Sequence, residues 1–399
     1  MSARRHEVVI VGGGTAGISV AARLRRARVA DVAVVEPSDV HYYQPLWTLV
    51  GAGLTDVRKT ARPEASVMPK GVTWIRQRAT GVDPEARTVP LGDGTSLGYE
   101  QLVLAPGLQL NFDAIPGLQA AVGHDGVASN YRADLAPRTW EFIQRAEPGT
   151  ALFVTPPGPI KCAGAPQKIA YLAADHWRRH GLLDRMRLIM VMPTAAMFSQ
   201  PDWGEVLKRI AAGYGIEVRH NTELAEVDGP NRRAVLLDTA TGTKEELDFQ
   251  FLHTAPPQSA PDWIRTGPLA DPAGPYGYVK VDQYTLRSPD WPDVFALGDV
   301  ANLPTSKTGA AIRKQAPVVA ANVLAARRGA PATARYDGYT SCPVVTAHNR
   351  MLLAEFDYTL TPRPSFPVID TMRPRYDMYL LKRYGLPQLY WHGMLRGRA

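Results

Sequence analysis

The chain has 399 residues, of which 45% are apolar and 21% charged, and its net charge is +7. These totals are typical of a globular protein with about two or three domains and a large core. The basic residues form no run like a nucleic-acid-binding arm, so we expect no nucleic acid partner. The charge excess is compatible with an anionic membrane surface or an anionic substrate. Two cysteines, Cys162 and Cys342, are too few for a secreted disulfide scaffold.

Residues 7–36 predict a strand, a G-x-G-x-x-G turn, an amphipathic helix and a second strand. Such glycines let the backbone turn tightly and approach a pyrophosphate, which rests on the helix N-terminus. The second strand ends in an acidic residue at the position that accepts hydrogen bonds from an adenosine ribose. A chance glycine cluster would not place the strand, helix and acid in register, so we predict a dinucleotide site. Its residues are Gly12, Gly14, Ala16, Gly17 and Glu36.

Two later strands end in residues of the same kind of site. Residues 100–111 predict a strand that ends at Ala105 and Gly107, and residues 291–302 predict one that ends at Asp299. An aspartate at the carboxyl end of a parallel strand can meet the hydroxyl groups of a ligand. The wide separation predicts a discontinuous nucleotide domain. Its parts are residues 1–111 and 256–330, and an inserted domain covers residues 112–255.

The inserted domain repeats the strand–turn–helix pattern without its nucleotide features. Its turn, "PPGPIKCAGAPQK" (156–168), lacks the spaced glycines, and prolines remove N–H groups that would bind phosphate. The next strand ends in "VMPTAAM", with no acid for a ribose. We therefore predict a Rossmann-like domain without a nicotinamide site, so that electrons must reach the other domain from another donor.

A cysteine occupies the turn where a phosphate would be expected. Cys162 lies just before a helix predicted to begin near Pro166, and the helix N-terminus and Lys161 would both lower its pKa. Cys342 lies in a predicted loop that enters a short apolar strand, and Pro343 follows it. The alternative is two ordinary buried cysteines or a structural pair.

With these stretches in place, the chain resembles the sulfide:quinone oxidoreductases, and most closely their mitochondrial-like type with two redox cysteines. The matching stretches span nearly the whole chain and include "GGGTAG", "HYYQPLWTLVGAG", "LVLAPG", "PPGPIKCAGAPQKIAYL", "FALGDVANLPTSKTGAAIRKQAPVVAANV" and "YDGYTSCPVVT". No cysteine precedes Cys162, which fits the two-cysteine type. The resemblance implies an α/β flavoprotein like glutathione reductase, with two Rossmann-like domains, a C-terminal membrane-associating region (331–399) and FAD as cofactor.

The resemblance also implies a mechanism. Cys162 and Cys342 would be joined by a disulfide or trisulfide beside the flavin, and hydrosulfide would attack Cys342 to give a persulfide. The Cys162 thiolate, a good leaving group at low pKa, would pass electrons to the flavin. The implied partners are hydrogen sulfide, ubiquinone or menaquinone, and a sulfur acceptor such as sulfide, glutathione, sulfite or cyanide.

Three residues are assigned to the surroundings of the flavin ring. In "HYYQPLWTLVGAG" (41–53), Gln44 and Pro45 would lie closest to the ring, although the stretch could instead be an aromatic core segment. Lys307 could stabilise the anionic reduced flavin, or could be a solvated loop lysine. The histidines form no metal-ligand pattern, and we expect no metal.

The tail mixes aromatic and basic residues. In residues 373–396 these would suit a membrane interface, and Pro387 would divide the segment into two short helices. The alternative is a helix pair packed on the core. The first strand begins near residue 7 without a secretory pattern, and no apolar segment reaches the ~18 residues needed to span a bilayer. We thus expect a peripheral enzyme on the cytoplasmic face of the inner membrane, and leave a homodimer open.

Three other functions remain open on the sequence. They are a sulfide dehydrogenase of the flavocytochrome c type, a type II NADH:quinone dehydrogenase, and a redox-sensing flavoprotein without turnover. The missing signal sequence disfavours the first, the altered turn disfavours the second, and the aromatic–basic tail disfavours the third.

Overall fold

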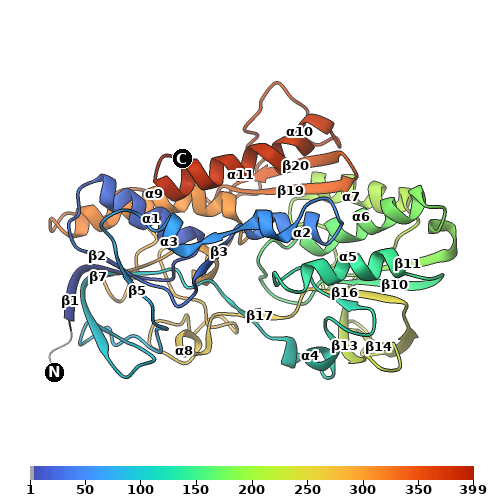
Figure 1. The fold of residues 1–399 in the computed structure, drawn as a ribbon, viewed down its shortest axis with the longest axis horizontal. Coiled ribbons are helices and arrows are strands. Elements are labelled where there is room, and N and C mark those ends of the chain that lie inside the picture. The colour runs from blue at the N-terminus through green and yellow to red at the C-terminus, as the bar shows by residue number, and fades with distance from the viewer. Residues whose placement is uncertain (1–3) are drawn as a thin grey trace.

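The computed structural model describes residues 4–399 and contains two parallel sheets with helices on their faces (Figure 1). The first sheet has the order β18-β7-β1-β2-β5, in which all neighbours are parallel, and β6 adds an antiparallel edge to β7. Its strands are β1 (Arg4–Val11), β2 (Val32–Val35), β5 (Thr73–Ile75), β6 (Thr88–Pro90), β7 (Ser96–Leu104) and β18 (Val294–Ala296). Strands buried on both faces, such as "VAVV" in β2, are typical of parallel sheets.

The second sheet has five parallel strands in the order β12-β11-β10-β16-β9. These are β9 (Val127–Ala128), β10 (Gly149–Val154), β11 (Met186–Val191), β12 (Glu217–Arg219) and β16 (Phe251–Thr254). Its helices are α5 (Ala136–Arg145), α6 (Ala165–Arg179) and α7 (Pro201–Gly213). The structure thus has the α/β architecture that the sequence predicts, although the predicted domain boundaries themselves stay a prediction.

Small elements complete the two layers. A meander of β13 (Thr222–Asp228), β14 (Arg233–Asp238) and β15 (Lys244–Asp248) lies at the far end of the second sheet, and β8 (Gln109–Leu110) pairs with β17 (Gln258–Ser259) where the chain crosses between the sheets (Figure 1). The remaining short elements are β3 (Val40–Tyr42), β4 (Ala61–Pro63), α2 (Trp47–Val50), α3 (Glu64–Val67), α4 (Leu118–Ala121) and α8 (Asp262–Arg265).

The C-terminal residues lie over both halves of the molecule (Figure 1). An antiparallel hairpin of β19 (Thr340–Ala347) and β20 (Arg350–Phe356) packs against α6 and against α9 (Gly309–Ala326). A helical run from α10 (Tyr376–Leu380) through α11 (Leu386–Gln388) to Arg396 then crosses the top and reaches α1 (Thr15–Arg26). The tail therefore bridges the two parallel sheets instead of standing apart from them.

The prediction that Pro387 divides the tail into two helices is wrong. The run from Tyr376 to Arg396 is unbroken, because π-helical turns at Leu381–Gly385 and Leu389–Gly393 flank α11. Pro387 lies just after the first of these π-helical turns, and the helical run continues through it. No helix within residues 4–399 is both long enough and apolar enough to cross a membrane.

Candidate active site

The glycine-rich turn between β1 and α1 leaves room for a ligand phosphate. A Cβ on Gly12, whose φ is +104°, would lie 2.3 Å from the carbonyl oxygen of Ala105, and one on Gly17 would lie 1.8 Å from that of Gly12. A Cβ on Gly14 would meet no atom within 4 Å, and Gly14 caps α1 without a side-chain hydrogen bond. The first N–H groups of α1 therefore stay free for an anion, and Ala16 is buried behind them. These features fit the pyrophosphate of FAD.

Glu36 stands at the end of β2 beside this turn. Its carboxylate accepts hydrogen bonds from the N–H groups of Gly13 and Ser38, both at 2.8 Å. Burial raises the pKa of Glu36, while these two hydrogen bonds oppose the rise. The position next to the turn is the one predicted for a ribose partner, and that role stays a prediction.

A buried network that the sequence did not reveal connects this turn to the tail. The imidazole of His41 lies 3.1 Å from the Glu64 carboxylate through Nδ1 and 2.6 Å from the Tyr390 hydroxyl through Nε2. Tyr390 in turn lies 2.9 Å from the hydroxyl of Thr15, the first residue of α1. One carboxylate oxygen of Glu64 is buried without a hydrogen-bond partner in the described structure, close to Gly13. The nucleotide turn and residue 390 thus share one polar core.

The carboxyl ends of β7 and β18 meet, because these strands are neighbours in the first sheet. Ala105 and Gly107 follow β7, and Asp299 follows β18. The carboxylate of Asp299 forms no hydrogen bond or ion pair with residues 4–399, and burial raises its pKa although Lys307 and Lys161 lower it. A half-buried carboxylate left free in this way fits a ligand hydroxyl group, such as those of the ribityl chain of FAD.

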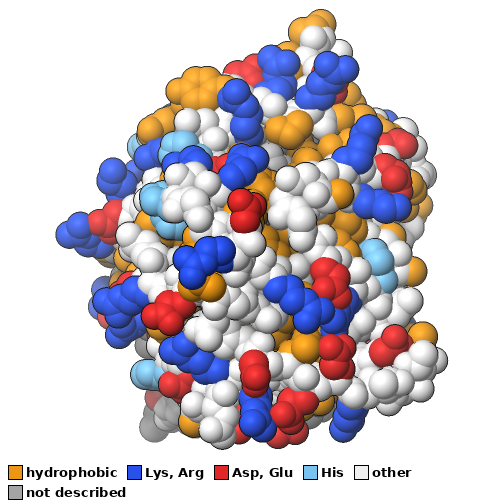
Figure 2. Space-filling view, turned by 90° about the vertical axis from the view of Figure 1, so that its right-hand side faces the viewer, with side chains coloured by type: hydrophobic (Ala, Val, Ile, Leu, Met, Phe, Trp, Pro, Cys, Tyr) orange, Lys and Arg blue, Asp and Glu red, His pale blue; other side chains and the backbone are white. Residues whose placement is uncertain are grey.

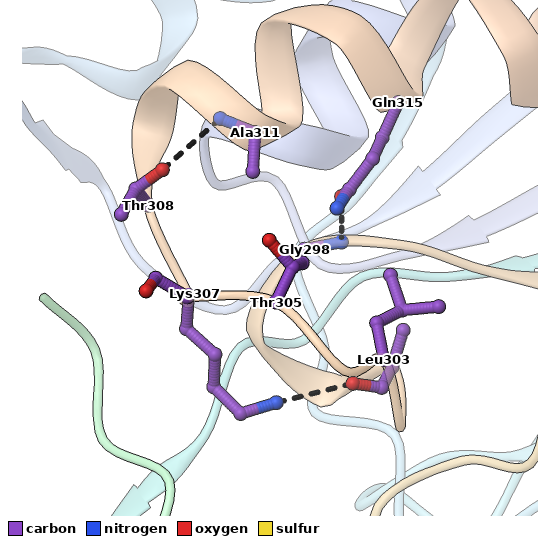
Figure 3. A pocket seen from close by; sticks show the side chains of 9 residues that line it. Gly298, Leu303, Thr305, Lys307, Thr308, Ala311 and Gln315 are labelled. Carbon is purple, nitrogen blue, oxygen red and sulfur yellow. Dashed lines mark hydrogen bonds between the residues drawn. The ribbon is translucent and has the colours of Figure 1, made fainter. Parts of the chain in front are cut away.

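Lys307 lies on the loop before α9, next to Thr308, and its side chain extends toward the segment that holds Leu303 (Figure 3). Its ammonium donates hydrogen bonds to the carbonyl oxygens of Asp299 and Ala301, at 2.6 and 3.1 Å, and lies 3.7 Å from the ring centroid of Tyr278. It is buried rather than solvated, and burial lowers its pKa to about 8. The described contacts engage the ammonium with protein groups, so a direct contact with flavin stays a prediction.

The two cysteines lie together between α6 and β19. Cys162 adopts a left-handed backbone conformation with φ of +53°, which is uncommon outside glycine and often marks a functional site. Its N–H donates to the carbonyl oxygen of Lys307 at 2.8 Å, which ties the thiol turn to the FAD side. A Cβ on Gly164 would lie 2.8 Å from the Sγ of Cys342, so glycine is needed for the two thiols to approach. Cys342 lies within β19 rather than in the predicted loop.

The predicted cause of the low Cys162 pKa is wrong in one part, because Lys161 is not its partner. The Lys161 ammonium points to the side-chain oxygen of Gln44, at 2.8 Å. It is Lys168, on the first turns of α6, whose Nζ lies 3.0 Å from the Cys162 Sγ. Helix α6 begins at Ala165, close to the predicted start.

The two thiols differ in acidity. The hydrogen bond with Cys342 and the Lys168 ammonium lower the pKa of Cys162 far below its usual range, despite burial. The same hydrogen bond together with burial raises the pKa of Cys342 far above its usual range. Lys168 is only 2% exposed, and although burial lowers its pKa the two sulfurs more than reverse this, so it stays charged. Of the two thiols, Cys162 is therefore the one that favours the thiolate form.

Lys382, which the sequence assigned to the membrane interface, belongs to this site. It is 2% exposed, and its Nζ donates to the carbonyl oxygen of Pro45 at 2.8 Å. Burial and the charge of Lys168 lower its pKa to about 7, while Cys162 and Cys342 oppose this. The carbonyl of Pro45 thus receives the tail lysine, while the neighbouring Gln44 receives Lys161.

The aromatic residues of the tail divide into two sets. Tyr379, Tyr390 and Trp391 are buried against the core, as the alternative of a docked helix pair expects. The apolar residues Tyr376, Leu380, Tyr384 and Leu389 are exposed, as a membrane-facing helix expects. The buried set confirms that this part of the tail packs on the core, and the membrane interface stays a prediction.

Comparison with known proteins agrees with this geometry. Residues 6–322 match the pyridine nucleotide-disulphide oxidoreductase family. The mitochondrial sulfide:quinone oxidoreductase of Dictyostelium discoideum is 41% identical over 98% of this chain and 86% of its own. The chain belongs to the sulfide:quinone oxidoreductases.

A further relative supports this membership, and a solved structure shares the fold. The mitochondrial sulfide:quinone oxidoreductase of Mus musculus is 39% identical over 99% of this chain and 88% of its own. The crystal structure of the sulfide:quinone oxidoreductase from Aquifex aeolicus superposes with a TM-score of 0.81, covering 99% of this chain and 92% of that one at 20% identity, which shows a shared fold. FAD is the cofactor of this family, in agreement with the prediction.

Proposed function

We propose that the chain oxidises sulfide through a relay between Cys162 and Cys342 and delivers two electrons to a quinone. The observation that carries the relay is the position of the two cysteines: the Sγ of Cys162 lies 3.0 Å from the Lys168 ammonium, and the Sγ of Cys342 packs against Gly164 in the same turn. Membership in the sulfide:quinone oxidoreductases supports the overall reaction. FAD, when bound, accepts the electron pair and passes it to the quinone.

The first step is attack on the oxidised pair. Hydrosulfide attacks the Sγ of Cys342, the bond between the two cysteine sulfurs breaks, and Cys162 leaves as a thiolate. The electron pair of the broken bond stays on Cys162, and the sulfide sulfur becomes the outer sulfur of a Cys342 persulfide. A leaving thiol with a low pKa departs faster, and Lys168 supplies the charge that stabilises it.

The second step removes the outer sulfur. An acceptor thiol or anion takes it as neutral sulfur, and Cys342 is left as a thiol or thiolate. Re-forming the disulfide then releases two electrons, and a proton if Cys342 is protonated. Lys382, whose pKa of about 7 lies near neutrality, is placed to hold a proton while the sulfurs carry negative charge and to release it when the neutral disulfide forms. The acceptor could be sulfide, glutathione, sulfite or cyanide.

The tail supports a peripheral membrane location. Of the large apolar side chains that are exposed in residues 4–399, most belong to residues 360–389, and basic residues lie among them. Figure 2 shows basic and apolar side chains side by side over the upper part of the molecule. Such mixtures suit a lipid interface, from which ubiquinone or menaquinone would reach the site. We place this interface on the cytoplasmic face of the inner membrane.

An anaerobic visible spectrum tests the proposal. Sulfide should bleach the flavin of the FAD-loaded chain, and a short-chain ubiquinone should restore it. The variants C162S and C342S should bind FAD but stay oxidised in sulfide. A flavin that ignores sulfide and is bleached by NADH would contradict the proposal and favour a type II NADH:quinone dehydrogenase.

A further inference from the structure

We propose that a basic pocket beside the tail binds the phosphate group of an anionic phospholipid. The proposal rests on the membrane association proposed above and adds a specific headgroup site to it. The pocket has a volume of about 550 Å³ and lies between α9, the segment before β19 and the segment after β20. Its lining includes four basic residues, Arg313, Lys314, Arg335 and Arg363, the ring of Tyr339, and one carboxylate, that of Asp337.

The protein neutralises only part of the positive charge of this pocket, because Asp337 is the one acidic residue among the lining residues. Among residues 4–399, Arg313, Lys314 and Arg335 take part in no ion pair. Arg363 makes only long ion pairs, of 3.7 and 3.9 Å, with the carboxylates of Asp357 and Asp337. Several cations gathered around one hollow repel each other unless an anion enters, and phosphate accepts hydrogen bonds from several such donors at once.

Aromatic and polar contacts hold these cations in place. Arg313 and Lys314 both lie over the ring of Tyr339, with 5.8 and 5.6 Å to its centroid, and Arg335 lies 4.1 Å from the centroid of Tyr284. The Tyr339 hydroxyl donates to the buried carboxylate of Glu355 at 2.5 Å, which fixes the ring. The cations therefore have support before a ligand arrives, which lowers the entropy cost of binding.

The pocket is separate from the redox cysteines. In the hairpin, Ser341 is paired with Glu355 and Cys342 with Ala354. Successive side chains of a strand point to opposite faces, so Cys342 faces α6, while Glu355 and the pocket residue Tyr339 that it contacts lie on the other face. An anion in the pocket would be on the wrong face of the hairpin to receive sulfur from Cys342. A role for the pocket as the sulfur-acceptor site is therefore disfavoured.

The wall of the pocket continues into exposed apolar residues. The N–H of Arg363 donates to the carbonyl oxygen of Glu355, and the N–H of Leu353 donates to the carbonyl oxygen of Thr371. Residues 363–371 therefore form a loop whose two ends are hydrogen-bonded to the outer edge of β20. This loop carries Val368, which is 94% exposed, and Leu360 precedes it at 39%. A phospholipid with its phosphate in the pocket could lay its acyl chains against these side chains, whereas a soluble phosphate would gain nothing from them.

Binding of the FAD-loaded full chain to lipid vesicles tests the proposal. One set of vesicles contains phosphatidylcholine alone, and in the other set part of it is replaced by phosphatidylglycerol. The pocket variant combines K314Q with R335Q, both exposed positions. The matched control combines R185Q with K244Q, which are exposed, remove the same charge and lie outside the pocket.

We expect the natural chain to bind phosphatidylglycerol vesicles more tightly than neutral ones. At about 1 kcal/mol per basic residue near an anionic surface, the pocket variant should lose roughly tenfold or more of this gain, and the control only a small part. The binding of the pocket variant to neutral vesicles should equal that of the natural chain. Equal losses in the two variants would overturn the proposal, and so would tight binding of inorganic phosphate that the pocket variant abolishes without any change in vesicle binding.

A second measurement separates this proposal from the proposed function. Turnover of sulfide with a water-soluble quinone should be the same for the natural chain, the pocket variant and the control. Normal turnover with no vesicle binding of any kind would overturn the lipid site and leave the sulfide chemistry intact. Lost sulfide turnover in the natural chain would instead contradict the proposed function, whatever the vesicles show.

Discussion

Replacing Lys168 by methionine should raise the pKa of Cys162 sharply. The ammonium of Lys168 lies 3.0 Å from the thiolate sulfur, and the lysine is only 2% exposed. Methionine keeps an unbranched side chain of similar length and removes the charge and the donor. The thiolate would then rest on the Cys342 hydrogen bond and on the more distant Lys382 alone, while burial would still oppose its charge.

The size of the effect follows from this distance. At 3.0 Å and an effective dielectric constant of about 20, two unit charges attract by about 5.5 kcal/mol, equal to about four pKa units. A hydrogen bond to a charged group alone contributes about 1.5–3 kcal/mol, or about one to two units. We therefore expect a rise of about two units or more. Once the pKa of Cys162 exceeds the pH of the assay, each further unit of pKa lowers the thiolate fraction about tenfold.

The assay is the rate of alkylation of Cys162 by iodoacetamide in the reduced enzyme as a function of pH, with the labelled peptide identified by mass spectrometry. In the natural chain the rate should already be at its plateau at neutral pH, and in K168M the midpoint should move to alkaline pH. Lys168→Arg should keep most of the charge and shift the midpoint little. The variant K314Q, which removes a charge outside the site, is the control. A K168M midpoint within half a unit of the natural one would refute the electrostatic account.

Three further changes test other parts of the structure. Tyr390→Phe removes one hydroxyl from the buried network and should lower the free energy of unfolding by about 1–3 kcal/mol and weaken FAD retention, measured by thermal melting and flavin release. Gly164→Ala should push away Cys342, whose sulfur would lie 2.8 Å from the new Cβ, and stop sulfide turnover, while Gly213→Ala, with open space around it, should not. Burial lowers the pKa of His253 from 6.5 to about 3, so the unfolded chain binds its proton first as the pH falls. Stability should therefore decline between about pH 6.5 and 3, and H253Q should make denaturant midpoints less sensitive to pH there.

The local parts of the site could be predicted from the sequence. The glycine turn, Glu36, Asp299 and the Cys162 turn each follow a buried strand, and neighbouring parallel strands bring their carboxyl ends together. The role of Lys168 beside Cys162 was missed. Lys168 is a charged residue in the first turn of a helix, and its neighbours in that turn are nearly all buried. A lysine in that setting needs an anionic partner.

The contribution of the tail could not be predicted, because it depends on how distant segments pack. Lys382 follows a tyrosine- and leucine-rich run that reads equally well as a membrane surface, and only the contact with Pro45 brings it to the thiols. The expectation of a helix break at Pro387 assumes α-helical hydrogen bonds on both sides of the proline. It fails here because π-helical turns change which N–H groups are needed.

The opposite pKa shifts of Lys168 and Lys382 indicate how the site handles charge. Both ammonium groups are buried near the same two sulfurs, yet the sulfurs raise the pKa of Lys168 beyond its usual value, while Lys382 falls to about 7. One thiolate therefore compensates the charge of one lysine, Lys168, and the second lysine, Lys382, is protonated only part of the time near neutral pH. Attack by hydrosulfide on the neutral disulfide brings one negative charge into the site as the Cys162 thiolate, and loss of the persulfide proton would add a second. Each new negative charge favours the protonated form of a nearby lysine, so the balance moves toward protonated Lys382. A tail that docks Lys382 against Pro45 thus supplies a group that can take up a proton as the persulfide forms and return it as the disulfide closes.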